Sequence, residues 1–240
     1  MLFEGKISVK AALASPYRTV EEILIDASKK DKDTAFILKT AETNNVPVKL
    51  LKRDEIDALA TGKTHGGILA YCKQRTYQPI AELLNDDFVV LIEGVEDPYN
   101  FGQMLRSLYA AGAQSLLLPP RNWTSAAETI VKSSAGASEF FKIHVYEDAS
   151  TALDALKNQG IKVICANRSA QAIPMYEVDM KQKLCLCIGG EKRGLSKTVL
   201  EKKDKEVYIP YQNHFRNALS ASSAATVLAY EVLRQRQQVA

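Results

Sequence analysis

Residues 97–106 of this chain read DPYNFGQMLR, and an apolar run, FVVLI, precedes them at residues 88–92. Asp97 and Pro98 are turn residues, and Asn100 is of a type that can cap the helix that follows. Gly102 lacks a side chain, which lets that helix approach another backbone closely, and Arg106 adds a guanidinium. A buried strand that leads through a turn into a helix is the repeating unit of parallel α/β folds. This stretch therefore predicts such a fold.

The same alternation of strand and helix continues to the end of the chain. Apolar runs predict strands at residues 88–93, 115–118, 161–166, 184–188 and 206–209. Helical periodicity marks residues 101–111, 125–132, 150–158, 195–202 and 220–236. This order predicts a mostly parallel sheet that is covered on both faces. The first of these helices lacks a Gly-x-Gly-x-x-Gly opening and the chain has no Gly-x-x-x-x-Gly-Lys-Ser/Thr loop, which sets aside two common nucleotide-binding folds.

A change of pattern near residues 77–86 divides the chain. Pro79 follows a strand-like run there, and Asn85-Asp86-Asp87 is turn chemistry. The preceding part predicts a small α/β domain. Its expected elements are a helix from Val20 to Lys29, a strand at residues 34–38 followed by another helix, and strands at 46–51 and 67–72 around a helix at 54–60. We expect domains at residues 1–76 and 87–240, joined by a linker at 77–86.

Composition and charge set broad limits on function. The chain has 240 residues, of which 46% are hydrophobic and 25% charged, as in ordinary globular proteins. No apolar run approaches the roughly 18 residues that span a bilayer, and the first residues are too polar for a signal peptide, so we expect a cytoplasmic protein. The net charge is only +3, from 31 basic and 28 acidic residues, so any nucleic-acid surface has to be local.

The four cysteines predict no metal site. Cys72, Cys165, Cys185 and Cys187 form no Cys-x-x-Cys pair and have no histidine at metal-ligand spacing. The last three lie in apolar runs, where a cysteine acts as a small hydrophobic residue.

Two further motifs follow in the second half of the chain. Residues 188–196 read IGGEKRGLS, in which Gly189 and Gly190 permit a turn that can fold around a ligand. The alternative is an ordinary connection from strand to helix, with Glu191 near the helix start. Residues 209–210 read IP and residues 218–224 read ALSASSA, which can equally be a helix start that packs closely against a partner.

In this order the three motifs resemble those of the SpoU (TrmH-type) RNA methyltransferases of the SPOUT superfamily. These enzymes move a methyl group from S-adenosylmethionine to a ribose 2′-hydroxyl. Val46-Pro47-Val48 and Thr64-His65-Gly66-Gly67-Ile68 resemble their N-terminal substrate-binding domain. The resemblance implies a C-terminal SPOUT domain with a trefoil knot, a homodimer that completes the active site, and RNA as the partner. It also implies S-adenosylmethionine as co-substrate without a metal, and 23S ribosomal RNA as the favoured substrate.

The resemblance also assigns roles to individual residues. It implies catalytic roles for Asn100, Arg106, Glu191 and Ser220. It implies donor contacts from Ala166, Asn167, Ile188, Gly189, Gly190, Gly194, Ile209, Pro210 and Leu219. Because a protonated arginine is a poor base, positioning and charge stabilisation are the physically safer roles for the guanidinium.

The third motif departs from the family pattern, which reads Ser-Leu-Asn-Val-Ser-Val-Ala. Ala218 stands in place of the first serine and Ser220 in place of the asparagine. Two alternatives therefore stay open beside a ribosomal RNA methyltransferase. One is a transfer RNA ribose methyltransferase, and the other is a non-catalytic RNA-binding protein derived from the same family.

Overall fold

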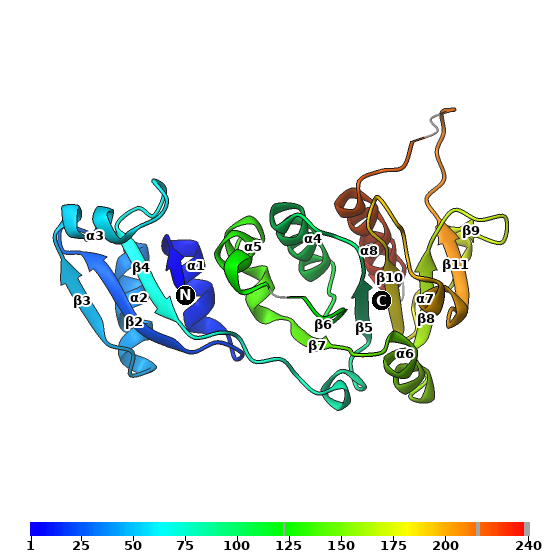
Figure 1. Cartoon of the computed structure of the whole chain (residues 1–240), viewed down its shortest axis with the longest axis horizontal. Coiled ribbons are helices and arrows are strands. Elements are labelled where there is room, and N and C mark those ends of the chain that lie inside the picture. Colours follow the sequence, from blue (N-terminus) through cyan, green and yellow to red (C-terminus); the bar gives the residue numbers. More distant parts are fainter. Residues whose placement is uncertain (122, 215–216, 238–240) are drawn as a thin grey trace. The chain divides into compact units, whose positions relative to one another are not determined.

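The chain forms two compact units in the computed structural model, which describes residues 1–121, 123–214 and 217–237 (Figure 1). The first unit combines Met1–Thr76 with Trp123–Phe140. The second combines Tyr77–Asn122 with Phe141–Ala240. Residues 123–140 therefore pack with the N-terminal part of the chain, although the sequence places them between two strands of the C-terminal sheet.

The first unit is built on a four-stranded mixed sheet in the order β1-β4-β2-β3. Its strands are β1 (Leu2–Glu4), β2 (Val20–Asp26), β3 (Val48–Leu51) and β4 (Ile68–Cys72). Strand β4 is antiparallel to both of its neighbours, whereas β2 and β3 are parallel. The helices are α1 (Lys6–Ala14), α2 (Lys32–Thr43) and α3 (Arg53–Leu59). The predicted strands at 46–51 and 67–72 and the predicted helix at 54–60 are thus confirmed to within two residues.

Two predictions in this unit were wrong, because the apolar spacing of a short segment can fit either a strand or a helix. The segment expected to be a helix from Val20 is strand β2, in which Ile23, Leu24 and Ile25 are all buried. Apolar residues on both faces of a covered strand can mimic a helical spacing. The expected strand at 34–38 lies inside helix α2, where Thr34, Ile37 and Ala41 are buried at helical spacing. Strand β1 and helix α1 had not been predicted.

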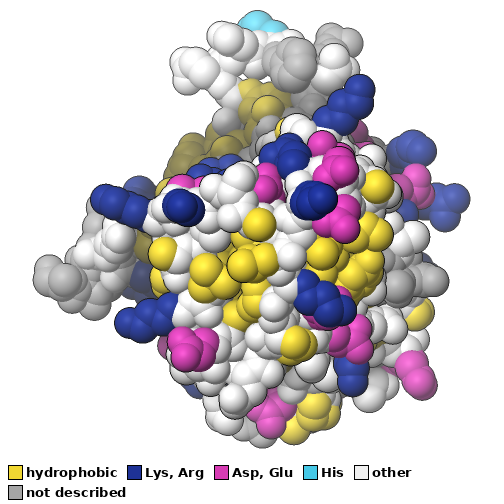
Figure 2. All heavy atoms as spheres, turned by 90° about the vertical axis from the view of Figure 1, so that its left-hand side faces the viewer, with side chains coloured by type: hydrophobic (Ala, Val, Ile, Leu, Met, Phe, Trp, Pro, Cys, Tyr) yellow, Lys and Arg dark blue, Asp and Glu magenta, His cyan; other side chains and the backbone are white. Residues whose placement is uncertain are grey.

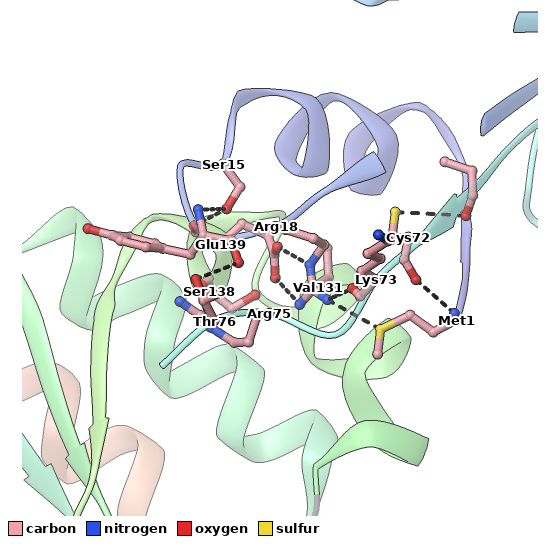
Figure 3. Close-up of polar contacts among 12 residues, drawn as sticks. Met1, Ser15, Arg18, Cys72, Lys73, Arg75, Thr76, Val131, Ser138 and Glu139 are labelled. Atoms are coloured by element: carbon pink, nitrogen blue, oxygen red, sulfur yellow. Dashed lines mark hydrogen bonds and ion pairs between the residues drawn. The ribbon is translucent and has the colours of Figure 1, made fainter. Parts of the chain in front are cut away.

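Residues 123–140 complete the core of the first unit. Helix α5 (Ala127–Ser133) places Val131 among buried residues of β1, α1 and β2, including Phe3, Val9 and Ile23. The short helix η3 (Ala137–Phe140) follows, and Figure 3 shows its contacts. There, Oγ of Ser15 donates to the Glu139 carbonyl at 2.7 Å, and Arg75 donates to the Ser138 carbonyl at 2.8 Å (Figure 3). The segment is therefore held by apolar burial and by hydrogen bonds.

The second unit is a seven-stranded sheet in which every pair is parallel, as predicted, with the order β7-β6-β5-β10-β8-β11-β9. Five strands lie within one residue of their predicted bounds: β5 (Phe88–Ile92), β6 (Ser115–Leu118), β8 (Lys162–Ala166), β10 (Leu184–Ile188) and β11 (Lys205–Tyr208). The edge strands β7 (Lys142–Val145) and β9 (Ile173–Pro174) had not been predicted. Strand β7 mixes apolar and polar residues and β9 has only two residues, so neither has the continuous apolar pattern of a central strand.

Helices α4 (Pro98–Ala110), α6 (Ala149–Asn158), α7 (Lys197–Glu201) and α8 (Ala221–Gln237) accompany this sheet. Helix α4 packs beside α8, and α6 beside α7 (Figure 1). The carboxylate of Asp97, and not Asn100 as expected, caps α4 by accepting the Asn100 amide at 2.7 Å. The trefoil knot stays a prediction.

The predicted linker packs onto the second unit. The amide of Gln78 donates to the Ile143 carbonyl of β7 at 2.8 Å, and Leu83 is fully buried beneath the sheet. All four cysteines are buried free thiols. Burial raises the pKa of Cys72 to about 12, which keeps it protonated and inert.

Candidate active site

A cavity of about 260 Å³ lies at the carboxyl ends of three neighbouring strands, β8, β10 and β11. Three chain segments line it. They are residues 166–168 after β8, residues 188–194 after β10, and residues from the end of β11 to the first turns of α8. In open parallel sheets the carboxyl ends of the strands are the usual place for a ligand. The cavity therefore brings together the second and third motifs, which the sequence had separated, with the segment after β8.

The turn after β10 begins with two glycines, Gly189 and Gly190, where there is no room for a side chain. A Cβ on Gly189 would lie 2.2 Å from the carbonyl carbon of Gly194, and one on Gly190 would lie 2.0 Å from the Gly94 oxygen. The amide of Gly194 donates to the Gly190 carbonyl at 2.9 Å and closes the turn. Such close backbone approach permits only glycine at positions 189 and 190. At these two positions the cavity wall is therefore backbone without side chains.

Glu93, at the end of β5, anchors the far end of this turn. Its carboxylate accepts the Ser196 amide at 2.7 Å and the Ser196 hydroxyl at 3.1 Å. It also accepts the Tyr146 hydroxyl at 3.0 Å, and burial together with this neighbouring carboxylate raises the Tyr146 pKa. Glu93 was not predicted as a site residue from the sequence, although an acidic residue directly after a buried strand and directly before Gly94 was an available signal.

Glu191 links the turn to the start of helix α8. Its Oε1 accepts the amide of Ala221, the first residue of that helix, at 3.2 Å. A carboxylate is favourable at this position because the first amides of a helix lack backbone partners and carry partial positive charge. Glu191 therefore holds two of the three motifs together.

A second hollow of about 180 Å³ shares Glu191 and Ala221 with the first cavity. Its other lining residues include Asn100, Lys192 and Ser222, together with residues 94–97. A carboxamide, an ammonium group, a hydroxyl and three carboxylates, those of Glu96, Asp97 and Glu191, thus surround one small space. The carboxylates suit hydroxyl groups of a polar molecule, and the ammonium group suits a phosphate oxygen.

The segment after β11 is tied to the segment after β8. The hydroxyl of Tyr211 accepts the Leu219 amide at 3.0 Å, and the Arg168 guanidinium lies 5.0 Å from the centre of the Tyr211 ring. Next to Arg168, the Asn167 amide group donates to Glu206 at 2.8 Å. Burial opposes ionisation of Glu206, but hydrogen bonds from Lys203, Ser169 and Asn167 outweigh it and lower its pKa. Neither Tyr211 nor Glu206 was singled out from the sequence.

The structure places most of the expected donor-binding residues around the first cavity. Ala166, Asn167, Ile188, Gly189, Gly190, Gly194, Ile209 and Leu219 all line it. Pro210 instead lines an adjoining outer hollow with Arg168, Tyr208, Ile209, Tyr211, Asn213 and His214.

The four expected catalytic residues are distributed differently. Asn100 and Glu191 line the second hollow. Ser220 caps helix α8, because its Oγ accepts the Ser223 amide at 3.2 Å, and it lines neither space. Arg106 is exposed on α4, away from both linings, and makes no hydrogen bond or ion pair with any residue that the structure describes.

The first unit offers a surface of mixed charge. Figure 2 shows hydrophobic side chains gathered on one face, with Lys and Arg as well as Asp and Glu around them. Large apolar side chains that this unit exposes include Phe36, Leu50 and Leu59. His65 is buried, with Nδ1 accepting the Gly67 amide at 3.2 Å and Nε2 lying 3.2 Å from Asp57. This histidine therefore holds a turn and is not presented to a partner.

Two absences apply to the part of the chain that the structure describes. No group of three or more His, Cys, Asp or Glu side chains is arranged to hold a metal ion. None of its helices has the length and apolar character needed to cross a bilayer.

Comparison with known proteins identifies the family. Residues 87–230 match the SpoU rRNA Methylase family, and residues 2–78 match the domain described as RNA 2′-O ribose methyltransferase substrate binding. A Staphylococcus saprophyticus protein assigned to the TrmH family of tRNA/rRNA methyltransferases is 30% identical over 242 residues, which cover 98% of this chain and 96% of that protein.

Solved structures share the fold. The SpoU methyltransferase AviRb from Streptomyces viridochromogenes, in complex with the cofactor AdoMet, has a TM-score of 0.81 at 22% identity and covers 99% of this chain and 90% of its own. An rRNA methyltransferase from Sinorhizobium meliloti has a TM-score of 0.79 at 18% identity, with 97% of this chain and 86% of its own covered. The matches across both halves of the sequence, together with the parallel sheet and its motif-lined cavity, place this chain in the SpoU family of RNA methyltransferases.

Proposed function

We propose that this protein methylates the 2′-hydroxyl of a ribose in 23S ribosomal RNA, with S-adenosylmethionine as the donor, and that it acts as a homodimer in the cytoplasm. The observation that carries the proposal is the cavity at the ends of β8, β10 and β11, where the second and third motifs meet, beside a hollow that Asn100 of the first motif lines. Family membership supports methyl transfer to RNA. The ribose 2′-hydroxyl as the acceptor and ribosomal RNA as the substrate are our proposals beyond family membership.

The first cavity fits the donor chemically. Its walls combine the backbone of the Gly189-Gly190 turn with small side chains such as Ala166 and Ala218, so a flat neutral base can approach amide and carbonyl groups. The Leu219 amide already donates to Tyr211, so the Leu219 carbonyl is the group we assign to the donor. The bound donor supplies a methyl group on a positively charged sulfur, which makes the methyl carbon susceptible to direct displacement. The cavity residues hold and orient it.

The second hollow is assigned to the acceptor ribose. It adjoins the donor cavity through Glu191 and contains the carboxamide of Asn100 and the ammonium of Lys192. These groups can hold ribose and phosphate oxygens in line with the methyl carbon. As the bond from the ribose oxygen to the methyl carbon forms, the bond from that carbon to sulfur would break and leave a neutral thioether, and the hydroxyl proton would pass to solvent. A nearby cation would stabilise the negative charge that develops on the oxygen.

Arg106 is assigned to a second copy of the chain. It lies on α4 outside both spaces, so it can supply that cation only if another subunit presents it. Helix α8, which packs beside α4, offers part of a dimer surface, since Tyr230 is 47% exposed whereas Leu228 is buried in its own subunit. A monomeric mass by light scattering at micromolar concentration would exclude this arrangement.

The N-terminal part is assigned to RNA recognition. Residues 1–76 form the proposed RNA-binding domain, residues 77–86 the linker and residues 87–240 the catalytic domain. The match of residues 2–78 to a substrate-binding domain supports this division. Because the S. saprophyticus relative is assigned to tRNA/rRNA methyltransferases, transfer RNA is the alternative substrate. The net charge of the chain is only +3, which favours recognition of a local RNA structure over general, charge-driven RNA binding.

One experiment tests substrate and atom together. The protein is incubated with methyl-labelled donor and with separately purified ribosomal and transfer RNA that lack the modification. Label in ribosomal RNA at a nucleotide that resists alkaline cleavage supports the proposal, because a 2′-O-methyl group removes the attacking hydroxyl. Label in transfer RNA, or on a base, would contradict it. RNA binding without label from the native protein or from Ser220→Asn would favour a non-catalytic role.

A further inference from the structure

Tyr211 lies at the boundary between the donor cavity and the outer hollow and contributes to both linings. It follows β11 directly after the Ile209-Pro210 pair. Its hydroxyl accepts the Leu219 amide at 3.0 Å, and its ring lies under the guanidinium of Arg168 at 5.0 Å. The Tyr211 side chain therefore contacts the segment after β8, through Arg168, and the segment before α8, through Leu219.

The hydrogen bond fixes a backbone group of the cavity wall. Leu219 directly precedes Ser220, the capping residue of α8, so its amide has no partner inside the helix. The Tyr211 hydroxyl satisfies that amide from a position eight residues earlier in the chain. Since Ala218 and Leu219 both line the cavity, the hydroxyl holds the peptide group between them in the cavity wall.

Arg168 is itself held in place from β11. The neighbouring Asn167 donates its backbone amide to Val207 at 3.0 Å and its side-chain amide to Glu206 at 2.8 Å. Glu206 is almost fully buried and pairs with Lys203 at 2.6 Å. This anchoring leaves the Arg168 guanidinium over the Tyr211 ring, where a planar cation is attracted to the aromatic face.

We propose that Tyr211 is a positioning residue for the methyl donor. Its hydroxyl holds Leu219 against the donor cavity, and Arg168 holds the Tyr211 ring in the orientation that this requires. The inference rests on the proposed function, in which the cavity binds S-adenosylmethionine. A wall that is already ordered in the free protein spares the donor the entropic cost of ordering it on binding. The contact should therefore slow donor release without taking part in the transfer itself.

The test uses the full-length protein and Tyr211→Phe, which keeps the ring and removes only the hydroxyl. Donor binding is measured by calorimetry with S-adenosylmethionine and with S-adenosylhomocysteine. We expect both to bind roughly three- to tenfold more weakly, the effect of one lost hydrogen bond, because of faster dissociation. The KM for the donor should rise while kcat at saturating donor changes little. Tyr176→Phe is the matched control, since Tyr176 is 56% exposed and lines none of the three spaces.

A direct reading comes from amide hydrogen exchange at Leu219. It should become faster in Tyr211→Phe and stay unchanged in Tyr176→Phe. Unchanged exchange, or unchanged donor affinity in Tyr211→Phe, would overturn the inference. If the native protein itself binds no donor, the proposed function fails instead, so the two failures are distinguishable.

Arg168 provides a second, independent variant. Arg168→Gln should weaken donor binding in the native background but have little further effect in the Tyr211→Ala background, because Arg168 acts through the Tyr211 ring. Equal losses in both backgrounds would show that Arg168 contacts the donor directly, and would overturn its role as the support of Tyr211. If Tyr211→Phe proves less stable to heat than Tyr176→Phe, the effect of Arg168→Gln in the two backgrounds still tests whether Tyr211 positions the donor.

Discussion

Arg18 and Glu139 lie 121 residues apart in the chain and form a two-pronged ion pair within the first unit (Figure 3). Nη2 of Arg18 donates to Oε1 of Glu139 at 2.9 Å, and Nε donates to Oε2. The two side chains are only 3% and 1% exposed. Removal of two charges from water is costly, and the paired geometry compensates for it. The pair fastens residues 123–140 to the N-terminal sheet.

Loss of one partner should destabilise the protein strongly. In Glu139→Gln the guanidinium of Arg18 keeps its charge but loses its counter-ion, so we expect a loss of about 3–5 kcal/mol in the free energy of unfolding. Urea denaturation measures it. Glu201→Gln is the control, because its partner Lys197 is 90% exposed and such pairs contribute about 0–1 kcal/mol. Equal stability of the two variants would show that the buried pair contributes nothing.

Removal of residues 1–76 should loosen residues 123–140 in the remaining chain. The apolar side chain of Val131 would lose the core that covers it, and Glu139 would lose Arg18. We expect faster amide hydrogen exchange across α5 in a 77–240 fragment, whereas exchange in α6 serves as the internal reference. Protection of α5 equal to that in the full chain would contradict the division into units.

Gly189→Ala should abolish the donor site by distorting its wall. The added methyl group would lie 2.2 Å from the Gly194 carbonyl carbon and 2.4 Å from the Leu195 nitrogen, both of them backbone atoms. We expect at least tenfold weaker binding of S-adenosylmethionine by calorimetry, since about 1.4 kcal/mol of displacement energy is enough for that loss. Gly160→Ala is the control for a strained glycine outside the site: its φ of +76° disfavours alanine, but a Cβ there meets no atom within 4 Å, so stability should fall while donor affinity stays unchanged. If Gly189→Ala bound the donor with native affinity, the donor site would not be in this cavity.

Arg106→Ala should separate chemistry from donor binding. The guanidinium is exposed on α4 and outside the donor cavity, so donor affinity should stay within about twofold. Methyl transfer should fall at least about a hundredfold, the usual effect of removing a group that stabilises developing charge. Gln103→Ala, also exposed on α4, is the matched control. Transfer that survives Arg106→Ala would refute the role assigned to the first motif.

Glu4 should make the first unit sensitive to acid. Burial opposes its ionisation, but hydrogen bonds from the Thr61 hydroxyl and from the amides of Thr61 and Gly62 outweigh burial and lower its pKa below 4.5. A lowered folded-state pKa contributes stability above pH 4.5, and that contribution is lost as the pH falls through the folded value. Glu4→Gln should thus be less stable than the native protein at neutral pH, with a difference that shrinks below pH 4.5.

Urea midpoints between pH 7 and pH 3 measure this difference. Glu42→Gln, at an exposed position of α2, is the control and should show no comparable loss at neutral pH. A gap between Glu4→Gln and the native protein that stays constant with pH would contradict the prediction.

The central strands of the second unit were predictable because burial on both faces leaves a continuous apolar run. FVVLI of β5 and LCLCI of β10 show this directly, and their parallel direction followed from the helices between successive strands, whereas their pairing with each other was not predicted. The same signal failed in the first unit. There, the covered strand β2 has apolar residues at spacings that also fit a helix, and α2 exposes Phe36 and Leu38 beside its buried positions.

The amino-acid sequence by itself determined the strand-turn-helix order, the glycines at positions 189 and 190, and the three motifs that identify the family. Each of these is carried by residues close together in the chain. Tertiary structure alone decided that residues 123–140 join the first unit, that Ser220 caps α8 instead of lining a cavity, and that Glu93 and Tyr211 hold the walls of the site. Most of these features depend on contacts between distant segments, such as those from Arg18 to Glu139 and from Glu93 to Ser196. Local sequence patterns carry no information about which distant group a side chain will meet, because that is settled only when the sheet and its helices pack.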